Sequence, residues 1–327
     1  MTEALKHQLN CLAEKDIGLV KFSEPLSRHS SWKIGGPADL FIEPDNPVQI
    51  TTVLKFLNTV SIPYLVIGQG TNLLFNDQGI RGVVMKIGER MAGVNISGRS
   101  VSAEGGIWVP KLSRMTMRAG LSGLEHCIGI PGTLGGLVMM NGGSQRRGIG
   151  ENITSVTVVN RLGQMETLDH DACRFSYRHS ALQECGSIVV RAELTCQQSN
   201  TADIRRTMLA DLRSRRQKFP RKQPNCGSVF LSTEEMYKTV GPPGKIIEQA
   251  GLKGMRIGQA EVSRQHANFI INRGGALASD VLKLIRHIRK EIRRKIGFEL
   301  DCEVRYVNGK GEATAAHLYA EDIDFHD

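Results

Sequence analysis

Residues 129–136, with the sequence Gly-Ile-Pro-Gly-Thr-Leu-Gly-Gly, constrain the fold of this chain more than any other stretch. Four of these eight residues are glycine, one is proline and none is charged. Because glycine has no Cβ, such a run lets the main chain come close to a ligand, most simply a phosphate or a flat ring. The alternative is a tight turn between core elements, and a single run of this kind is more often a turn than a site.

A second glycine run, Gly68-Gln-Gly70-Thr-Asn-Leu-Leu-Phe75, follows the apolar stretch Tyr64–Ile67. This pattern predicts a strand that feeds a glycine-rich turn, the usual place for a pyrophosphate cradle. Together, the two runs favour a binding site over two structural turns. Neither contains an intact GxGxxG, so a Rossmann dinucleotide fold has no direct support.

The cysteines indicate a reducing compartment. There are seven, an odd number, and they are scattered and form no CxxC pair. This argues against a disulfide framework and against a zinc site. The histidines form no metal-spaced cluster, so we expect no metal. The N-terminus has no apolar signal core, and no window approaches 18 apolar residues. We therefore expect a soluble cytoplasmic protein without a membrane partner.

The formal net charge is +9, and basic residues gather at 205–222 and 283–295. Such clusters could attract nucleic acid or an acidic membrane. The alternative for the second cluster is the solvated face of a packing helix, because the apolar residues between its charges keep three-to-four spacing. Aromatic residues make up only 5% of the chain, which weakens a single-strand stacking surface. We expect no nucleic-acid partner, and a small anionic ligand such as a nucleotide explains part of the charge.

The order of predicted elements suggests three domains and a tail. A first β-α-β domain covers 1–88, a β-rich second domain with the main glycine run covers 89–198, and an α+β domain covers 199–307. Residues 308–327 are predicted to be a flexible acidic tail. The predicted helices are 1–20, 47–59, 108–119 and 202–217, and the predicted strands are 38–44, 64–67, 82–87, 92–96, 99–104, 153–160, 164–168, 187–195 and 299–307.

Three positions have side chains suited to catalysis. In the predicted strand 299–307, Glu303 shares one face with Asp301 and Arg305, and this face either lines a cleft or meets solvent, with solvent favoured by pattern alone. Ser228 is predicted to lie on a turn that leads into a strand, where a serine usually caps a backbone amide. Arg178 could hold a carboxylate with two hydrogen bonds, or form a surface ion pair.

Taken in order, these residues resemble the UDP-N-acetylenolpyruvoylglucosamine reductases of peptidoglycan precursor synthesis. The resemblance covers about residues 22–307, and no single motif decides it. It is carried by segments in the correct order, namely 31–39, 68–75, 129–136, 140–143, 175–178, 227–230, 251–258, 262–269 and 303–305.

The resemblance implies an α+β flavoprotein. Its first two domains would form an FAD-binding module of the vanillyl-alcohol-oxidase type, and a third α+β domain would bind the substrate. FAD would be noncovalent, and NADPH would be the co-substrate. Separately, we expect a monomer or weak oligomer. The positions that match the family's FAD loops are Gly68, Gly70, Thr71, Asn72, Gly129, Pro131, Gly132, Thr133, Gly135 and Gly136.

The resemblance also implies roles in catalysis for Arg178, Ser228 and Glu303. Hydride would pass from NADPH through the flavin to the β-carbon of the enolpyruvyl ether of UDP-N-acetylglucosamine, giving UDP-N-acetylmuramate. Arg178 and a protonated Glu303 would lie at the substrate carboxylate, and Ser228 would protonate the α-carbon. Lys218 occupies the place of a substrate-binding lysine, and Tyr177 and His266 are further substrate-binding candidates.

The chain departs from the family pattern at several positions. The family often continues the serine motif with a basic residue and Asn-Pro, where this chain has Leu231-Ser232-Thr233, so one substrate contact is in doubt. Gly142 replaces an alanine. The link between Arg178 and Lys218 is short and contains no tyrosine, which matches the subtype without a capping-tyrosine insertion. A different flavoprotein oxidoreductase of the same fold, such as an oxidase, and a basic nucleic-acid-binding protein are the alternatives.

Overall fold

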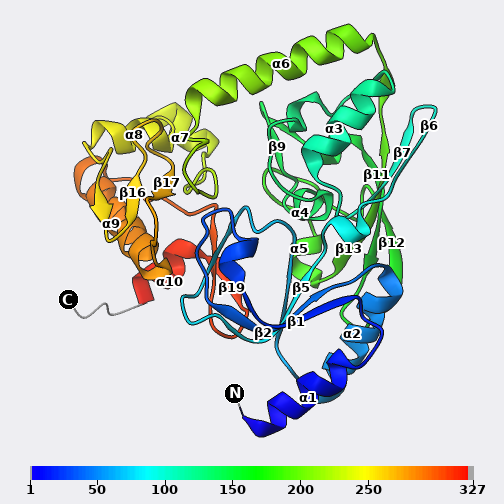
Figure 1. The fold of residues 1–327 in the computed structure, drawn as a ribbon. Coiled ribbons are helices and arrows are strands. Elements are labelled where there is room, and N and C mark those ends of the chain that lie inside the picture. The colour runs from blue at the N-terminus through cyan, green and yellow to red at the C-terminus, as the bar shows by residue number, and fades with distance from the viewer. Residues whose placement is uncertain (1, 323–327) are drawn as a thin grey trace. The chain divides into compact units, whose positions relative to one another are not determined.

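The computed structural model describes residues 2–322, which divide into two compact units. Unit 1 contains the chain up to Phe22 together with Leu40–Gln69 and Val83–Arg215, and unit 2 contains Ser23–Asp39, Gly70–Gly82 and the chain from Arg216 onward. Figure 1 shows the fold and labels many of the helices and strands. The predicted domain limits at residues 88 and 198 do not coincide with these units and stay a prediction.

A four-stranded sheet has most of its residues in unit 1. Its order is β1-β2-β5-β3, and β3 runs parallel to β5. Helix α2 begins where predicted, because the Asn46 side chain accepts hydrogen bonds from the amides of Val48 and Gln49 and Pro47 opens the helix. Helix α1 ends at Ala13, earlier than predicted. The bounds are α1 (Glu3–Ala13), β1 (Leu19–Pro25), β2 (Pro37–Glu43), α2 (Pro47–Val60), β3 (Tyr64–Ile67) and β5 (Ile80–Lys86).

The second sheet of unit 1 is antiparallel, in the order β12-β11-β13-β7-β6, and all five of its strands were predicted. Its strands are β6 (Val94–Ser97), β7 (Ser100–Glu104), β11 (Ile153–Val159), β12 (Met165–Asp169) and β13 (Ile188–Thr195). The remaining elements are η2 (Glu89–Met91), α3 (Val109–Arg118), β8 (Leu121–Ser122), η3 (Glu125–Cys127), α4 (Leu134–Met139), β9 (Gly143–Ser144), β10 (Arg147–Gly148), η4 (Ile149–Asn152), α5 (Leu182–Cys185), β14 (Gln197–Gln198) and the long α6 (Thr201–Lys218), which passes from unit 1 into unit 2.

Unit 2 has its own core and two small sheets. One sheet has the order β15-β16-β17, and in the other β4 lies parallel to β18, which pairs antiparallel with β19. The buried Trp32 belongs to this core, and its indole nitrogen donates to the Ile270 carbonyl at 2.7 Å. The elements are η1 (Leu26–His29), β4 (Leu73–Phe75), α7 (Glu234–Thr239), α8 (Pro243–Gln249), β15 (Arg256–Ile257), β16 (Ala260–Val262), β17 (Ile270–Asn272), α9 (Ala278–Ile296), β18 (Arg305–Val307), β19 (Ala313–Ala315) and α10 (Ala316–Asp322).

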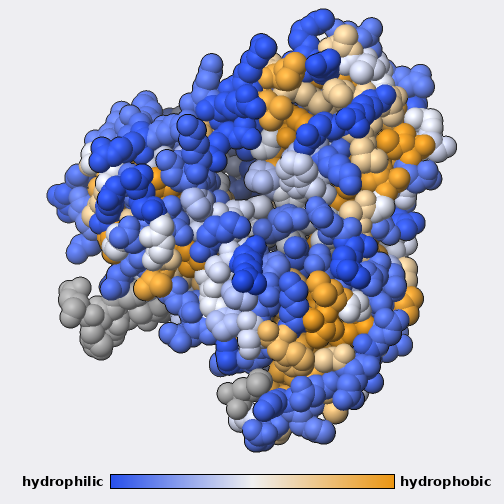
Figure 2. Space-filling view, in the orientation of Figure 1, coloured by the Kyte–Doolittle hydropathy of each residue, from blue (hydrophilic) through white to orange (hydrophobic). Residues whose placement is uncertain are grey.

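Helix α9 confirms the helix predicted from its apolar spacing. Val281, Leu284, Ile285, Ile288 and Ile292 are all buried in the unit 2 core. Most basic residues of the second cluster lie on the other side of the helix and are exposed, and the view in Figure 2 is mostly hydrophilic over this helix. This cluster is therefore the solvated face of a packing helix. Among residues 2–322, no helix is long and apolar enough to cross a membrane.

The C-terminal part of unit 2 differs from the sequence expectations in two ways. The strand predicted over 299–307 is regular only as β18, although its alternation of buried and more exposed residues holds. Residues 308–322 are not a loose tail, because they include β19 and α10, and Ala316 and Ala320 are buried in the core. Short strands and a helix without strong apolar periodicity left no local signal for this segment. Residues 323–327 of the predicted tail lie outside the described residues.

Candidate functional site

The two glycine runs meet inside unit 1. Strand β3 ends at Ile67, and the next residue, Gly68, lies against Thr133 of the second run. A Cβ at Gly68 would overlap the Thr133 hydroxyl oxygen, so glycine at this position makes room for the Thr133 side chain. The strand and glycine turn predicted from the sequence are confirmed, and the fold brings the two runs together across 65 positions of sequence.

Hydrogen bonds to the loop between β7 and α3 hold the second run in place. The Val109 amide donates to the Gly132 carbonyl at 3.0 Å, and the Gly135 amide donates to the Gly105 carbonyl at 2.7 Å. Gly105 is itself confined, because a Cβ there would overlap the Val189 carbonyl oxygen. Gly105 was not among the sequence candidates, and the pair Gly105-Gly106 between a strand and a helix was the signal that could have found it.

The surface of the second run suits a cofactor that contacts main chain. Gly136 and Pro131 are exposed, and a Cβ at Gly136 would meet nothing closer than the Thr133 hydroxyl at 3.5 Å. The buried Thr133 hydroxyl accepts a hydrogen bond from the Gly136 amide at 3.4 Å, which fixes the turn into α4. At the start of the run, a Cβ on Gly129 would overlap the Arg215 side chain. The glycines thus keep the loop thin enough for a phosphate or ring to reach its backbone.

The rest of the first run belongs to unit 2 and contacts that unit's backbone. Gly70 has a left-handed φ of +59°, and its carbonyl accepts from the Ser31 amide at 3.2 Å. Thr71 is half-buried. The Asn72 side-chain amide donates to the Glu303 carbonyl at 3.0 Å, and the Asn72 carbonyl accepts from the Arg305 amide at 3.1 Å. Asn72 therefore clamps the backbone at Glu303, whereas its contact with a cofactor stays a prediction.

Ser228 and Glu303 are brought together by the same backbone ladder in unit 2. Val229, the residue after Ser228, accepts a hydrogen bond at its carbonyl from the Glu303 amide at 2.8 Å. Phe230 and Cys302 form an isolated antiparallel bridge beside it. Two of the three predicted catalytic residues therefore lie on adjacent segments, although 75 positions separate them in the sequence.

Asn268, a buried residue with no predicted role, holds the segment after Ser228 by hydrogen bonds. Asn268 is 3% exposed, and its carbonyl accepts from the Val229 amide at 2.9 Å. Its side chain accepts from the Phe230 amide and donates to the Phe230 carbonyl, each at 2.9 Å. A buried amide with both ends satisfied fixes a backbone rigidly. Asn268 lies in the family-like segment 262–269, which was the available signal.

Arg178 lies in unit 1, on a turn that contacts the segment 141–143 after α4. Its turn is closed by two hydrogen bonds between the backbones of Ser176 and His179, at 3.0 and 3.1 Å. The Asn141 side chain donates to the Ser176 carbonyl at 2.8 Å, and Arg178 donates from Nη1 to the Gly143 carbonyl at 3.3 Å.

The backbone at Arg178 is in an uncommon conformation for an arginine. Its φ is +56°, a left-handed value that residues other than glycine rarely adopt. Residues in such conformations are concentrated at functional sites. The guanidinium carbon lies 5.7 Å from the centre of the ring of Tyr177, which is 62% exposed. The turn thus presents a cation and an exposed aromatic ring beside the segment 141–143.

Lys218 and His266 share one neighbourhood in unit 2. The ring of His266 packs edge-on against Phe219 and Phe269, with centroid distances of 5.3 and 5.0 Å, and Phe219 directly follows Lys218. Burial, helped by the nearby charges of Lys253 and Lys218, lowers the pKa of His266, so its ring is neutral near pH 7. The fold therefore groups these two substrate-binding candidates around an aromatic cluster.

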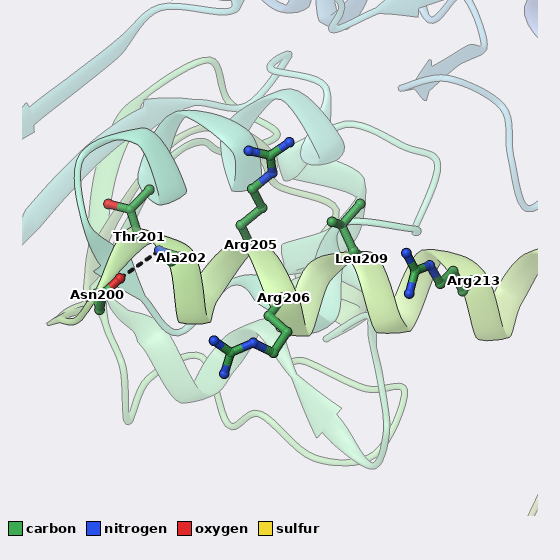
Figure 3. Close-up of a pocket in the computed structure, with 7 residues that line it drawn as sticks. All are labelled: Asn200, Thr201, Ala202, Arg205, Arg206, Leu209 and Arg213. Atoms are coloured by element: carbon green, nitrogen blue, oxygen red, sulfur yellow. Dashed lines mark hydrogen bonds between the residues drawn. The ribbon is translucent and has the colours of Figure 1, made fainter.

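A pocket of about 640 Å³ lies at α6 in unit 1, and Figure 3 shows its lining residues. Three of its lining residues are arginines of the first basic cluster, and none is a predicted cofactor or substrate residue. The lining residues are Asn200, Thr201, Ala202, Arg205, Arg206, Leu209 and Arg213. Within residues 2–322, no group of three or more histidine, cysteine, aspartate and glutamate side chains could hold a metal ion.

Comparison with known proteins assigns both halves of the chain. Residues 38–169 match the FAD binding domain family, and residues 219–307 match the C-terminal domain of UDP-N-acetylenolpyruvoylglucosamine reductase. The first match contains the meeting point of the glycine runs. The second contains Ser228, Asn268 and Glu303. The predicted α+β class, with an FAD-binding module followed by a further α+β domain, is confirmed.

Relatives with this reductase name align over nearly the whole chain. A protein named UDP-N-acetylenolpyruvoylglucosamine reductase 1 from Corynebacterium glutamicum is 45% identical, covering 91% of this chain and 89% of the relative. The reductase of Heliobacterium modesticaldum is 41% identical over 88% and 90% of the two chains. The crystal structure of the reductase from Thermus caldophilus superposes with a TM-score of 0.74 at 29% identity, covering 88% of this chain and 98% of that one. With its glycine runs, its Val229–Glu303 backbone pairing and these matches over nearly the whole chain, the chain belongs to the UDP-N-acetylenolpyruvoylglucosamine reductase family.

Proposed function

We propose that the protein catalyses the FAD-dependent, NADPH-using reduction of UDP-N-acetylglucosamine enolpyruvate to UDP-N-acetylmuramate in peptidoglycan synthesis. Membership of the reductase family supports the reaction. The observation that carries the proposal for this chain is the pair of thin main-chain loops that meet at Gly68 and Thr133, in the segment matching an FAD binding domain. The seven free cysteines support a reducing, cytoplasmic setting.

We assign FAD to the loops at 68–72 and 129–136. The cofactor, when bound, supplies the two-electron chemistry that takes hydride from NADPH and delivers it to the β-carbon of the enolpyruvyl group. Glycine at 68, 132, 135 and 136 lets the backbone approach it, and Thr133 holds the turn. The binding is noncovalent in this proposal, and the protein acts as a monomer or weak oligomer.

We assign the substrate carboxylate to Arg178 and Glu303. When hydride reaches the β-carbon, negative charge develops on the α-carbon and spreads into the carboxylate. Arg178, whose guanidinium donates to the Gly143 carbonyl, would stabilise this charge as a fixed cation. Glu303 would keep a proton at the carboxylate, because two unprotonated carboxylates would repel each other.

We assign the proton donor to Ser228. A serine hydroxyl is a weak acid, so it can protonate the α-carbon only because the intermediate there is a far stronger base. The placement must therefore be accurate, and the hydrogen bonds from Asn268 and Glu303 to Val229 and Phe230 supply it. Lys218, His266 and Tyr177 would contact the rest of the UDP-sugar. The short segment between Arg178 and Lys218 supports the subtype without a capping tyrosine.

A spectroscopic experiment tests the reaction. The purified protein, with FAD added if needed, is expected to show flavin absorption, to lose it on anaerobic addition of NADPH, and to regain it when the enolpyruvyl UDP-sugar is added. Oxygen uptake coupled to NADPH oxidation, with no response to the sugar, would point to an oxidase instead. A folded protein that binds no flavin would contradict the proposal.

Gly68→Ala tests the loop contact on which the FAD assignment depends. The added methyl would overlap the Thr133 hydroxyl, so we expect a loss of about 1–3 kcal/mol of stability and a lower flavin-to-protein ratio. Thermal melts and absorption spectra measure the two effects. The matched control is Gly309→Ala, where an added Cβ would meet nothing closer than the Gly79 carbonyl oxygen at 3.8 Å, and this variant should keep its flavin.

A double-mutant cycle with Thr133→Ala identifies the cause. Because removal of the hydroxyl makes room for the new methyl, the double variant should lose less stability than the sum of the two single losses. Additive losses would show that the Gly68–Thr133 contact is not what requires glycine.

A further inference from the structure

The backbone around Glu303 is held on both sides in unit 2. The Glu303 amide donates to the Val229 carbonyl, and the Glu303 carbonyl accepts from the Asn72 side chain. One residue later, the Val304 carbonyl accepts from the Ala316 amide at 3.0 Å. One residue earlier, the buried Cys302 amide donates to Nδ1 of His317 at 2.9 Å. Two of these four contacts come from α10 at the C-terminal end.

His317 is suited to accept this hydrogen bond. It is 8% exposed, and its other ring nitrogen, Nε2, lies 3.3 Å from a carboxylate oxygen of Asp301. With Nδ1 accepting from an amide, the proton of the neutral ring lies on Nε2 and points to Asp301. Burial first, and the charge of Arg289 second, lower the pKa of His317 against the opposing effects of Asp301 and Glu321. The neutral form that the amide contact requires is therefore favoured.

The surroundings of His317 keep the preceding segment in place as well. Arg289 of α9 is 6% exposed, and it donates to the Leu300 carbonyl. The same guanidinium lies 2.8 Å from Glu321 of α10 and 3.6 Å from Asp301. Helices α9 and α10 thus hold residues 300–302 by hydrogen bonds and an ion pair, and these residues directly precede Glu303. Because the direction of a side chain depends on its backbone, these contacts help to set where the Glu303 carboxyl group points.

We propose that His317 is a positioning residue for Glu303, and that through it α10 forms part of the scaffold of the reaction site. The inference rests on the proposed function, because it needs Glu303 to act on the substrate carboxylate. Its action is indirect. His317 holds the Cys302 amide in place, and this also fixes the backbone position of the adjacent Glu303. Hydride transfer from NADPH does not involve the Glu303 carboxyl group, so only the step that uses the enolpyruvyl sugar should respond.

The test compares His317→Asn with His317→Gln. Asparagine can place a carbonyl oxygen near the position of Nδ1 and keep the Cys302 contact, whereas glutamine reaches toward the position of Nε2. In anaerobic stopped-flow, we expect His317→Gln to slow flavin reoxidation by the enolpyruvyl UDP-sugar on the order of 10- to 100-fold, since small misplacements have effects of that size. Reduction by NADPH should change less than about twofold, and His317→Asn should recover most of the lost rate.

His287→Gln on α9 is the control, because among residues 2–322 His287 has no hydrogen bond to the segment 299–304, and both steps should keep their rates. Equal rates of reoxidation in the asparagine and glutamine variants, or equal losses in both half-reactions, would overturn the inference. Asp301→Asn gives a second test that should not disturb folding, because the Asp301 side chain is 64% exposed. It should slow the same half-reaction to a smaller extent. A wild-type protein that does not use the sugar would instead defeat the proposed function.

Discussion

Ser228→Ala is expected to leave flavin reduction by NADPH nearly unchanged and to slow reoxidation by the enolpyruvyl UDP-sugar on the order of 10²–10⁴-fold, the usual contribution of a placed general acid. The structure indicates that the Ser228 hydroxyl can be removed without disturbing the backbone around it. Among residues 2–322 no group forms a hydrogen bond with the Ser228 hydroxyl, and the backbone after it is held by Asn268 and by the Glu303 amide. Removing the hydroxyl should therefore change the chemistry without unfolding the segment.

Stopped-flow absorbance separates the two half-reactions for this variant. Ser97→Ala, at an exposed position in the hairpin of β6 and β7, serves as the control and should match the wild type in both. An unchanged rate of reoxidation in Ser228→Ala would remove Ser228 from the role of acid. Equal slowing of both steps would mean that the loop, and not the proton, had been disturbed.

Glu303→Ala should impair the same half-reaction on the order of 10²–10³-fold, the typical effect of losing one group that stabilises developing charge. The physical reason is that a protonated carboxyl group beside the substrate carboxylate shares a proton with it as negative charge accumulates there. Glu303→Gln tests whether a neutral hydrogen-bond donor is enough at this position, because glutamine is neutral, similar in size and still a donor. We expect its rate to fall between those of the wild type and the alanine variant.

The matched control for these variants is Glu312→Gln in the hairpin between β18 and β19, where Glu312 is exposed and hydrogen-bonds to Asn308. It should leave both half-reactions intact. If Glu303→Gln were no faster than Glu303→Ala, a neutral hydrogen-bond donor at this position would not restore any of the rate, against the proposal. An effect limited to reduction by NADPH would contradict the assignment of Glu303 to the sugar step.

Much of the fold could be predicted where the signal is local. Apolar residues at three-to-four spacing predicted α9, and Pro47 predicted the start of α2. The strand β3 followed by Gly68 was predicted from an apolar stretch and two glycines. Each of these signals lies within a few residues, because helix periodicity, capping and turn chemistry act over one or two turns of chain.

The site was predicted residue by residue but not as a set of contacts. Ser228 and Glu303 were candidates, yet nothing in their own segments indicated that the backbone of Val229 pairs with Glu303. Asn268 and His317 were missed as supports. Their function comes from partners that are distant in sequence, and an asparagine or histidine has no local pattern that shows which amide it will bind.

The sequence by itself determined which segments become strands, helices and thin glycine loops, because those choices depend on side-chain period and on missing Cβ atoms. Only the tertiary structure decided that Gly68 lies on Thr133, that Asn268 holds the chain after Ser228, and that the C-terminal α10 supports Glu303. The physical reason is that such contacts join segments distant in sequence and form only when the whole hydrophobic core folds. A short segment such as 313–322 gains its structure from the apolar and hydrogen-bonding partners that the rest of unit 2 provides.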